Sequence, residues 1–263
     1  MTELAAISPE RHAKKVWKQA TDYAFAATDT AIPLVGVELS KAVPAMPIGF
    51  IEQEGGYQLV AITSLQPETN LYVGPDGKWV VPYIPATLRA YPFRLVQQES
   101  SDKSILCIDE ASGLVMDNTE DGNAFFDDQN EPTQEIKDIL NFLTEVEGSR
   151  TATQGAVNAL ADADLITPWE LNLKQGEKVV PVKGLFRIDE AALNEVDDDD
   201  FLTLREAGGL ALAYAQLLSM NQLAVLERLG ELQGQILAQQ AESEAAGLTG
   251  FSLAEDEGSL MFD

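Results

Sequence analysis

The sequence predicts an α+β protein: a mixed, β-rich body with a helical pair and a long C-terminal helix. Three observations support this. Short apolar runs between Gly and Pro turns fill residues 23–110, which is typical of strands. Apolar residues at helical spacing follow near residues 134–147 and 150–163. The stretch 210–246 has no proline and is rich in Ala, Leu, Gln and Glu, which favours one long helix.

The first predicted element is a short helix over residues 8–20. Ser8 is a suitable N-cap residue and Pro9 suits the first turn. Val16 and Trp17 fall on the apolar side of this helix.

The β-rich part contains two predicted hairpins. Residues 48–53 and 57–65 are joined by Gly55-Gly56, which can adopt positive φ. Residues 70–84 form the second hairpin, with Pro75-Asp76-Gly77 as the turn.

Four more segments lead into the second half of the chain. A short helix ends before Pro92. Strands over residues 94–98 and 104–110 follow, joined by the polar turn Glu99–Lys103. After an irregular acidic stretch, Thr133 opens the first helix of the pair, and residues 169–189 return to strands with a turn at Gln175-Gly176.

The long C-terminal helix has two halves of different character. Residues 210–223 are apolar nearly all round, so we expect them to be buried in the core. In the second half, Val225, Leu229, Leu232 and Ile236 follow the 4-3-4 spacing of a coiled-coil seam. This seam packs either on its own domain or on another chain, and the sequence leaves both open.

These features divide the chain into an α+β domain over residues 1–223, a helical extension over 224–246 that can form a coiled coil, and an acidic tail over 247–263. The tail is either a frayed terminus or a docking peptide for a partner with a basic rim. In the second case its apolar anchors are Phe251, Leu253, Leu260, Met261 and Phe262.

The net charge of −26 restricts the partners. An anionic surface repels nucleic-acid phosphates and anionic lipid, so we expect neither nucleic-acid binding nor membrane insertion. It favours basic protein surfaces, divalent cations or a salty medium. No apolar stretch resembles a signal peptide or a membrane-spanning helix, so we expect synthesis in the cytoplasm.

The chain has one histidine, His12, and one cysteine, Cys107. These are too few for an iron site with two histidines or for a Cys/His zinc site, and no pattern indicates a Ser-His-Asp triad. We therefore assign no catalytic residue and no cofactor. Cys107, between Leu106 and Ile108 of a predicted strand, is expected to be buried and inert.

Calcium is the one ion for which the sequence offers candidate ligands. Asp117, Glu120, Asp121 and Asn123 surround Gly122 in an acidic loop, although the EF-hand spacing is absent. The alternative is a solvated loop. The run Asp197–Asp200 is better explained as the start of a helix, where acids interact favourably with the helix dipole.

Two further sets of residues have structural and functional interpretations. Asp109 and Glu110 end a strand, and we expect them to make hydrogen bonds or ion pairs with Arg89 or Arg94 rather than acid–base chemistry. The aromatic residues between Tyr72 and Phe93 form either a β-rich core or a carbohydrate-binding surface.

Several blocks of sequence in a fixed order resemble the SapC family, named for an S-layer-associated protein of bacteria. They include SPERHAKK, NLYVGPDGKWVVPYIPATLRAYPF and GLFRIDEAALNEVDDDDFLTLREAGG, and the resemblance covers roughly residues 6–223. It implies a single α+β domain and an association with the cell surface or S-layer. Similar sequences also occur in phages, where a virion component is the natural role.

Together these observations predict a non-enzymatic structural or interaction protein of a surface layer or virion, bacterial or phage in origin. It would form a homo-oligomer or larger assembly through the C-terminal helix and acidic tail. Two alternatives are a carboxylate-based glycan-binding or glycan-active accessory protein and an acidic mimic of nucleic acid.

Overall fold

The computed structural model describes residues 3–98, 104–117, 121–175 and 178–252. At its centre lies a five-stranded antiparallel sheet in the order β10-β13-β4-β5-β3. The α+β class is confirmed. The strands of this sheet are β3 (Ala31–Pro33), β4 (Ile48–Gln53), β5 (Gly56–Ile62), β10 (Ile166–Pro168) and β13 (Leu185–Ile188).

The first predicted hairpin is present as β4 and β5. Its turn differs from the prediction by one residue: the positive φ angles belong to Glu54 (52°) and Gly55 (80°), whereas Gly56 already pairs with Gln53. Two successive residues with positive φ match the twist of the flanking strands, which is why two-residue hairpin turns favour them.

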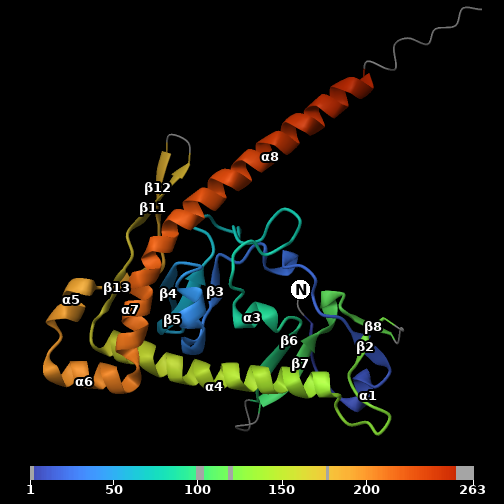
Figure 1. The fold of residues 1–263 in the computed structure, drawn as a ribbon, viewed down its shortest axis with the longest axis horizontal. Helices are drawn as coiled ribbons and strands as arrows, with labels where there is room; N and C mark the ends of the chain where they lie inside the picture. Colours follow the sequence, from blue (N-terminus) through green and yellow to red (C-terminus); the bar gives the residue numbers. More distant parts are fainter. Residues whose placement is uncertain (1–2, 99–103, 118–120, 176–177, 253–263) are drawn as a thin grey trace, which may run out of the picture.

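One face of the sheet is covered by helices α4 (Gln134–Asp162) and α7 (Gly209–Ser219) (Figure 1). The main core between them contains large side chains that are almost fully inaccessible, such as Phe50, Ile62 and Leu160. The short helix α2 (Leu39–Ala42) and the helix α6 (Asp198–Ala207) pack at its margin.

The predicted helical pair is a single continuous helix, α4, which corrects the expectation of a break near Gly148. A glycine inside a helix costs only about 1 kcal/mol relative to alanine, and packing at both ends outweighs this. The backbone bonds continue across the site, and Arg150 Nε donates to Glu147 one turn earlier at 2.8 Å.

The N-terminal half of α4 packs against a second, three-stranded sheet. Its order is β1 (Leu4–Ala6), β7 (Ser104–Asp109) and β6 (Phe93–Gln97). Ile136 and Leu143 of α4 contact Phe93 and Ile108 in a separate cluster. The two predicted strands are therefore confirmed as β6 and β7, while the turn Glu99–Lys103 lies outside the described residues.

The predicted helix over residues 8–20 is wrong beyond its first turn. Helix α1 ends at His12 (Pro9–His12), and residues Lys15–Trp17 form strand β2 between β8 (Val115–Asp117) and β9 (Asn123–Ala124). Val16 and Trp17 are buried by this pairing. β-branched and aromatic side chains favour strands, and here the partner strands lie a hundred residues further on.

The second predicted hairpin forms only its turn. Gly77 has a φ of 77°, and one isolated bridge joins Val73 to Trp79, without regular strands. Local side-chain bonds replace the ladder: Trp79 Nε1 donates to the carbonyl oxygen of Tyr83 at 2.7 Å. The following short helix is α3 (Ala86–Arg89).

A two-stranded sheet of its own consists of β11 (Leu171–Gln175) and β12 (Lys178–Val182). The predicted turn at Gln175-Gly176 falls partly outside the described residues. Helix α5 (Glu190–Glu195) follows, and α6 begins at the acidic run as predicted, with the Asp197 side chain accepting from Asp200 N at 2.9 Å. Single-turn helices are η1 (Ala24–Ala26), η2 (Gly36–Glu38), η3 (Glu110–Ser112) and η4 (Met220–Gln222).

The C-terminal helix is interrupted once. Helix α7 ends at Ser219, η4 makes a tighter turn, and α8 (Leu223–Ser252) continues past the predicted end at Ala246. By length and composition alone, the stretch Gly209–Ile236 is long and apolar enough to cross a membrane, a test that core helices of soluble proteins also pass. The expected absence of membrane insertion therefore stays a prediction.

Candidate interaction site at the C-terminal helix

Helix α7 is anchored to the main sheet by two buried polar side chains. Gln216 Oε1 accepts from Ile188 N at 3.0 Å, and its Nε2 donates to Ile48 O at 3.1 Å. Ser219 Oγ accepts from Ile48 N at 2.9 Å. Both side chains are fully inaccessible to solvent. These bonds orient the base from which α8 extends.

The outer side of α7 is apolar and accessible. Tyr214 is 51% exposed and Leu218 is 63% exposed. The expectation that residues 210–223 are buried nearly all round is thus only half right. Two polar residues of this stretch, Gln216 and Ser219, face inward, where backbone groups of two sheet strands require hydrogen-bonding partners.

The start of α8 packs on the body through one side of the helix. Leu226 is buried, and Val225 and Leu229 pack against the main core. Further along the helix, Gln233 Nε2 donates to the carbonyl oxygen of Val73 at 3.1 Å. Up to this point, α8 is part of the body.

The seam predicted from the 4-3-4 spacing is divided by this contact. Its first two members, Val225 and Leu229, pack on the same chain, whereas Leu232 is 45% exposed and Ile236 is 37% exposed. The side of the helix that contacts the body runs through Leu226 and Gln233, and Leu232 and Ile236 lie at its edge. Beyond Gln233, α8 extends away from the sheets and the other helices (Figure 1).

The other predicted partner-binding residues are not placed. Phe251 lies in α8, and nothing is described of its side chain. Leu253, Leu260, Met261 and Phe262 lie outside the described residues. Their role in docking stays a prediction.

The acidic loop predicted to bind calcium is only partly described. Asp117 ends β8, Asp121 precedes β9 and Asn123 lies in β9, all exposed, while Glu120 lies outside the described residues. Within the described ranges, no group of three His, Cys, Asp or Glu side chains is arranged to hold a metal ion. Gly122 has a packing role, because a Cβ there would lie 2.4 Å from Val16 Cγ2. Calorimetric titration with calcium chloride checks the prediction.

A charged cluster lies between α1, β2 and η3. Glu110 accepts from Arg11 and, at 2.7 Å, from Lys15 Nζ. The expected partners Arg89 and Arg94 are wrong for Glu110: Arg89 instead lies over the Phe142 ring, 5.0 Å from its centroid. Arg11 and Lys15 are one helical turn apart in sequence but nearly a hundred residues from Glu110, so no local pattern indicated the pairing.

His12 is fully buried next to this cluster. Its Nδ1 accepts from Ser8 N at 3.3 Å, and its Nε2 lies 3.4 Å from Glu110 Oε1 without a hydrogen bond. Burial lowers the pKa of His12, with Lys15 and Arg11 acting in the same direction and Glu110 opposing them. The side chain is thus held neutral, and its packing against the Phe125 ring indicates a structural role.

The aromatic cluster belongs to the interior. Tyr72, Tyr83 and Phe93 are buried. The Tyr83 hydroxyl donates to Glu38 Oε1 at 2.6 Å, and Glu38 also accepts from Ala86 N and Val35 N. Burial and Glu38 raise the pKa of Tyr83. Cys107 is buried as predicted, and burial raises the pKa of its thiol.

The structure is an α+β body of several small sheets with a protruding C-terminal helix, and α7 and α8 carry exposed apolar residues such as Leu218 and Leu232. The sequence model of the SapC family matches residues 7–226, so the chain belongs to the SapC family. No curated protein and no solved structure gives a significant match. The family match ends at Leu226, the buried residue at the base of α8.

Proposed function

We propose that this SapC-family chain is a non-enzymatic structural or interaction protein of a surface layer or a virion. It associates with other copies, and with partners that present a basic surface, through α8 and the acidic residues 247–263. The observation that carries the proposal is the extension of α8 beyond Gln233 with Leu232 and Ile236 exposed.

The stability of the uncovered part of α8 supports this proposal. Helix α8 has 30 residues, which corresponds to a length of about 45 Å. Single helices are marginally stable in water, and most helical stability in proteins comes from packing of an amphipathic face. Leu232 and Ile236 provide that face where the body no longer covers it, so contact with a second molecule stabilises α8.

The test compares the solution mass of the full-length protein with that of two variants by light scattering. Leu232→Lys with Ile236→Lys places charge on the exposed seam. Gln235→Lys with Ala238→Lys adds the same charge at exposed positions outside the seam and serves as the control.

We expect the wild type and the control to be oligomeric. For the seam variant, the dissociation constant of the oligomer should be roughly tenfold higher than for the wild type, or more. Point substitutions are preferable to truncation after residue 223, because that truncation removes Leu226 from the core. A monomeric wild type, or a seam variant that associates as strongly as the control, contradicts the proposal.

A further inference from the structure

The arm, defined as residues 171–184, stands out in charge from the rest of the chain. It contains Lys174, Lys178 and Lys183 against Glu177 alone, in a protein with net charge −26. Lys178 and Lys183 are exposed, and among the described residues no ion pair involves either side chain. Residues 171–184 therefore carry a net charge of +2 on a strongly anionic molecule.

The arm is also apolar and weakly supported. It is a two-stranded sheet that pairs, within the described residues, with no other strand. Val179 is 61% exposed and Val180 is 40% exposed. Two-stranded sheets are marginally stable alone in water, and unpaired strand edges readily receive an extended segment.

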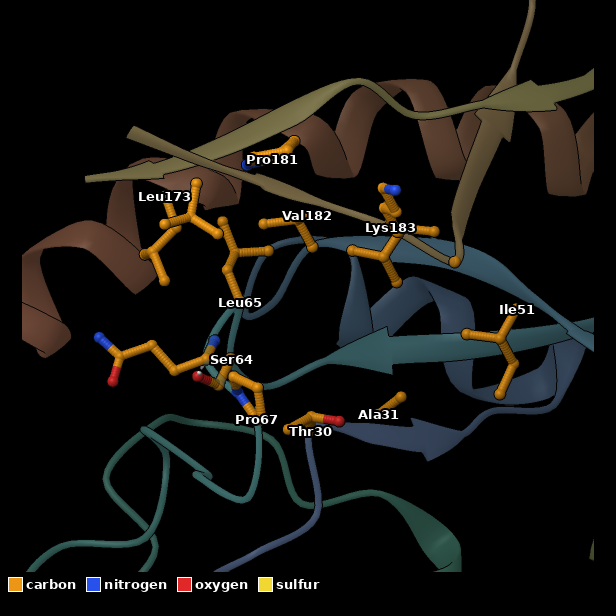
Figure 2. A pocket seen from close by; sticks show the side chains of 14 residues that line it. Thr30, Ala31, Ile51, Ser64, Leu65, Pro67, Leu173, Pro181, Val182 and Lys183 are labelled. Carbon is orange, nitrogen blue, oxygen red and sulfur yellow. Dashed lines mark hydrogen bonds between the residues drawn. The ribbon is translucent and has the colours of Figure 1, made fainter. Parts of the chain in front are cut away.

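A hollow of about 450 Å³ lies between the arm and the main sheet. Figure 2 shows Leu173 and Val182 of the arm on one side of this hollow and Ile51 of β4 on another. Lys183 lies at its margin. The hollow therefore combines an apolar interior with an adjacent cation, which suits a segment that carries apolar side chains next to carboxylates.

Residues 250–263, GFSLAEDEGSLMFD, have this complementary composition. They carry Glu255, Asp256, Glu257 and Asp263 and contain no lysine or arginine. Their large apolar residues are Phe251, Leu253, Leu260, Met261 and Phe262.

The length of α8 indicates that the occupant comes from another copy. Leu226 belongs to the main core, against which Ile51 and Leu185 of the hollow also pack. From Leu226 to Ser252 the helix rises by about 39 Å, away from the body (Figure 1). Residues 253–260 span at most about 28 Å when extended, which is less than this rise, so we expect Leu260 of the same chain not to reach back to the body.

We propose that the hollow and the arm lysines bind residues 250–263 of a second copy of this chain. This inference rests on the proposed function and deepens it, because it names the surface that the acidic segment contacts. The lysines attract the carboxylates, and the hollow takes the apolar residues that follow them.

The first experiment measures binding of a fluorescent peptide, residues 250–263, by anisotropy. The receptor is the full chain carrying Glu255→Lys, Asp256→Lys and Glu257→Lys, so that its own segment does not compete. Adding Lys178→Glu and Lys183→Glu to this receptor should weaken binding about tenfold or more, and added salt should weaken it as well. The matched control is Lys41→Glu with Lys137→Glu, which makes the same charge change on α2 and α4.

A second peptide tests the hollow. Replacing Leu260, Met261 and Phe262 by serine preserves the charge and should also reduce affinity about tenfold or more. Equal binding of the peptide to the arm variant and to the control overturns the inference. Equal binding of the serine peptide overturns the role of the hollow.

Mixing two full-length variants separates a second copy from the chain's own segment. The arm variant and the segment variant should each be largely monomeric, and their mixture should associate because one retains the arm and the other the segment. If mixing restores nothing, the occupant is not a second copy and the inference is wrong. The two proposals can also fail separately. If the peptide binds in an arm-dependent way while the Leu232/Ile236 variant associates as strongly as the wild type, the role of α8 is wrong and this inference stands.

Discussion

Gln216 of α7 joins the backbone of Ile48 in β4 to that of Ile188 in β13 through its side-chain amide, at 3.1 and 3.0 Å. In the register that pairs Phe50 with Phe186, Ile48 and Ile188 stand opposite each other two residues further along. The amide thus replaces a direct hydrogen bond of the sheet at the point where the two strands separate.

Replacing Gln216 with leucine should destabilise the fold by about 2–5 kcal/mol, because two buried backbone groups lose their partner. The measurement is the free energy of unfolding in urea. Gln235→Leu on the exposed surface of α8 is the control and should change stability by less than about 0.5 kcal/mol. Similar values for both variants would show that the bridge adds nothing.

Glu110 should make stability depend on acid. Its hydrogen bonds with Arg11 and then Lys15 lower the pKa of the carboxyl from 4.5 to about 2. Because the pKa is lower in the folded state, the stabilisation is present above about pH 4.5 and is lost as the pH falls towards about 2.

The variant Glu110→Gln should therefore lose about 1–3 kcal/mol at pH 7 and approach the wild type near pH 2–3. Urea unfolding at pH 7, 4.5 and 3 measures this. The exposed Glu52→Gln variant is the control, and a Glu110→Gln variant with the wild-type pH dependence would contradict the assignment.

Gly122 and Gly148 should respond in opposite directions to alanine. A Cβ at Gly122 would lie 2.4 Å from the side chain of Val16, so the substitution should cost about 1–3 kcal/mol through overpacking. At Gly148, in the middle of α4, a Cβ meets nothing within 4 Å, and alanine should stabilise by up to about 1 kcal/mol. Thermal unfolding of both variants provides the comparison.

Glu38 should be essential for the contact between η2 and α3. Its carboxylate accepts from the Tyr83 hydroxyl, Ala86 N and Val35 N in a buried position. Glu38→Ala leaves these donors unpaired and should cost about 3 kcal/mol or more in the free energy of unfolding. The control is Glu54→Ala, which removes a carboxylate from the exposed hairpin turn. An equal loss of stability in this control would refute the role of Glu38.

Local patterns predicted the elements that depend on neighbours in sequence. The hairpin of β4 and β5 needs only apolar strands and a turn at Glu54 and Gly55. The helix α6 needs only its cap at Asp197. The coiled-coil spacing likewise found Leu232 and Ile236, the two seam residues that the body leaves exposed.

Elements that depend on distant partners were beyond such patterns. The apolar residues Val16 and Trp17 suit a helix or a strand. They form a strand because β8 and β9 pair with them on either side. Similarly, Gln216 lies in a stretch that the sequence predicts to be buried, but the backbone groups of Ile48 and Ile188 that its amide binds are identified only by the structure. The arm lysines became a candidate site only when the structure placed Lys183 beside an apolar hollow.

The protruding part of α8 has a geometrical consequence for assembly. From Gln233 to Ser252 it is a helical spacer of about 28 Å between a body and the segment that follows. In the proposed exchange, the donor segment and the arm are different surfaces, so each contact between copies would be heterologous. A reciprocal exchange closes a two-fold dimer, whereas a one-way exchange closes a ring or extends as a filament whose repeat is set by the helix.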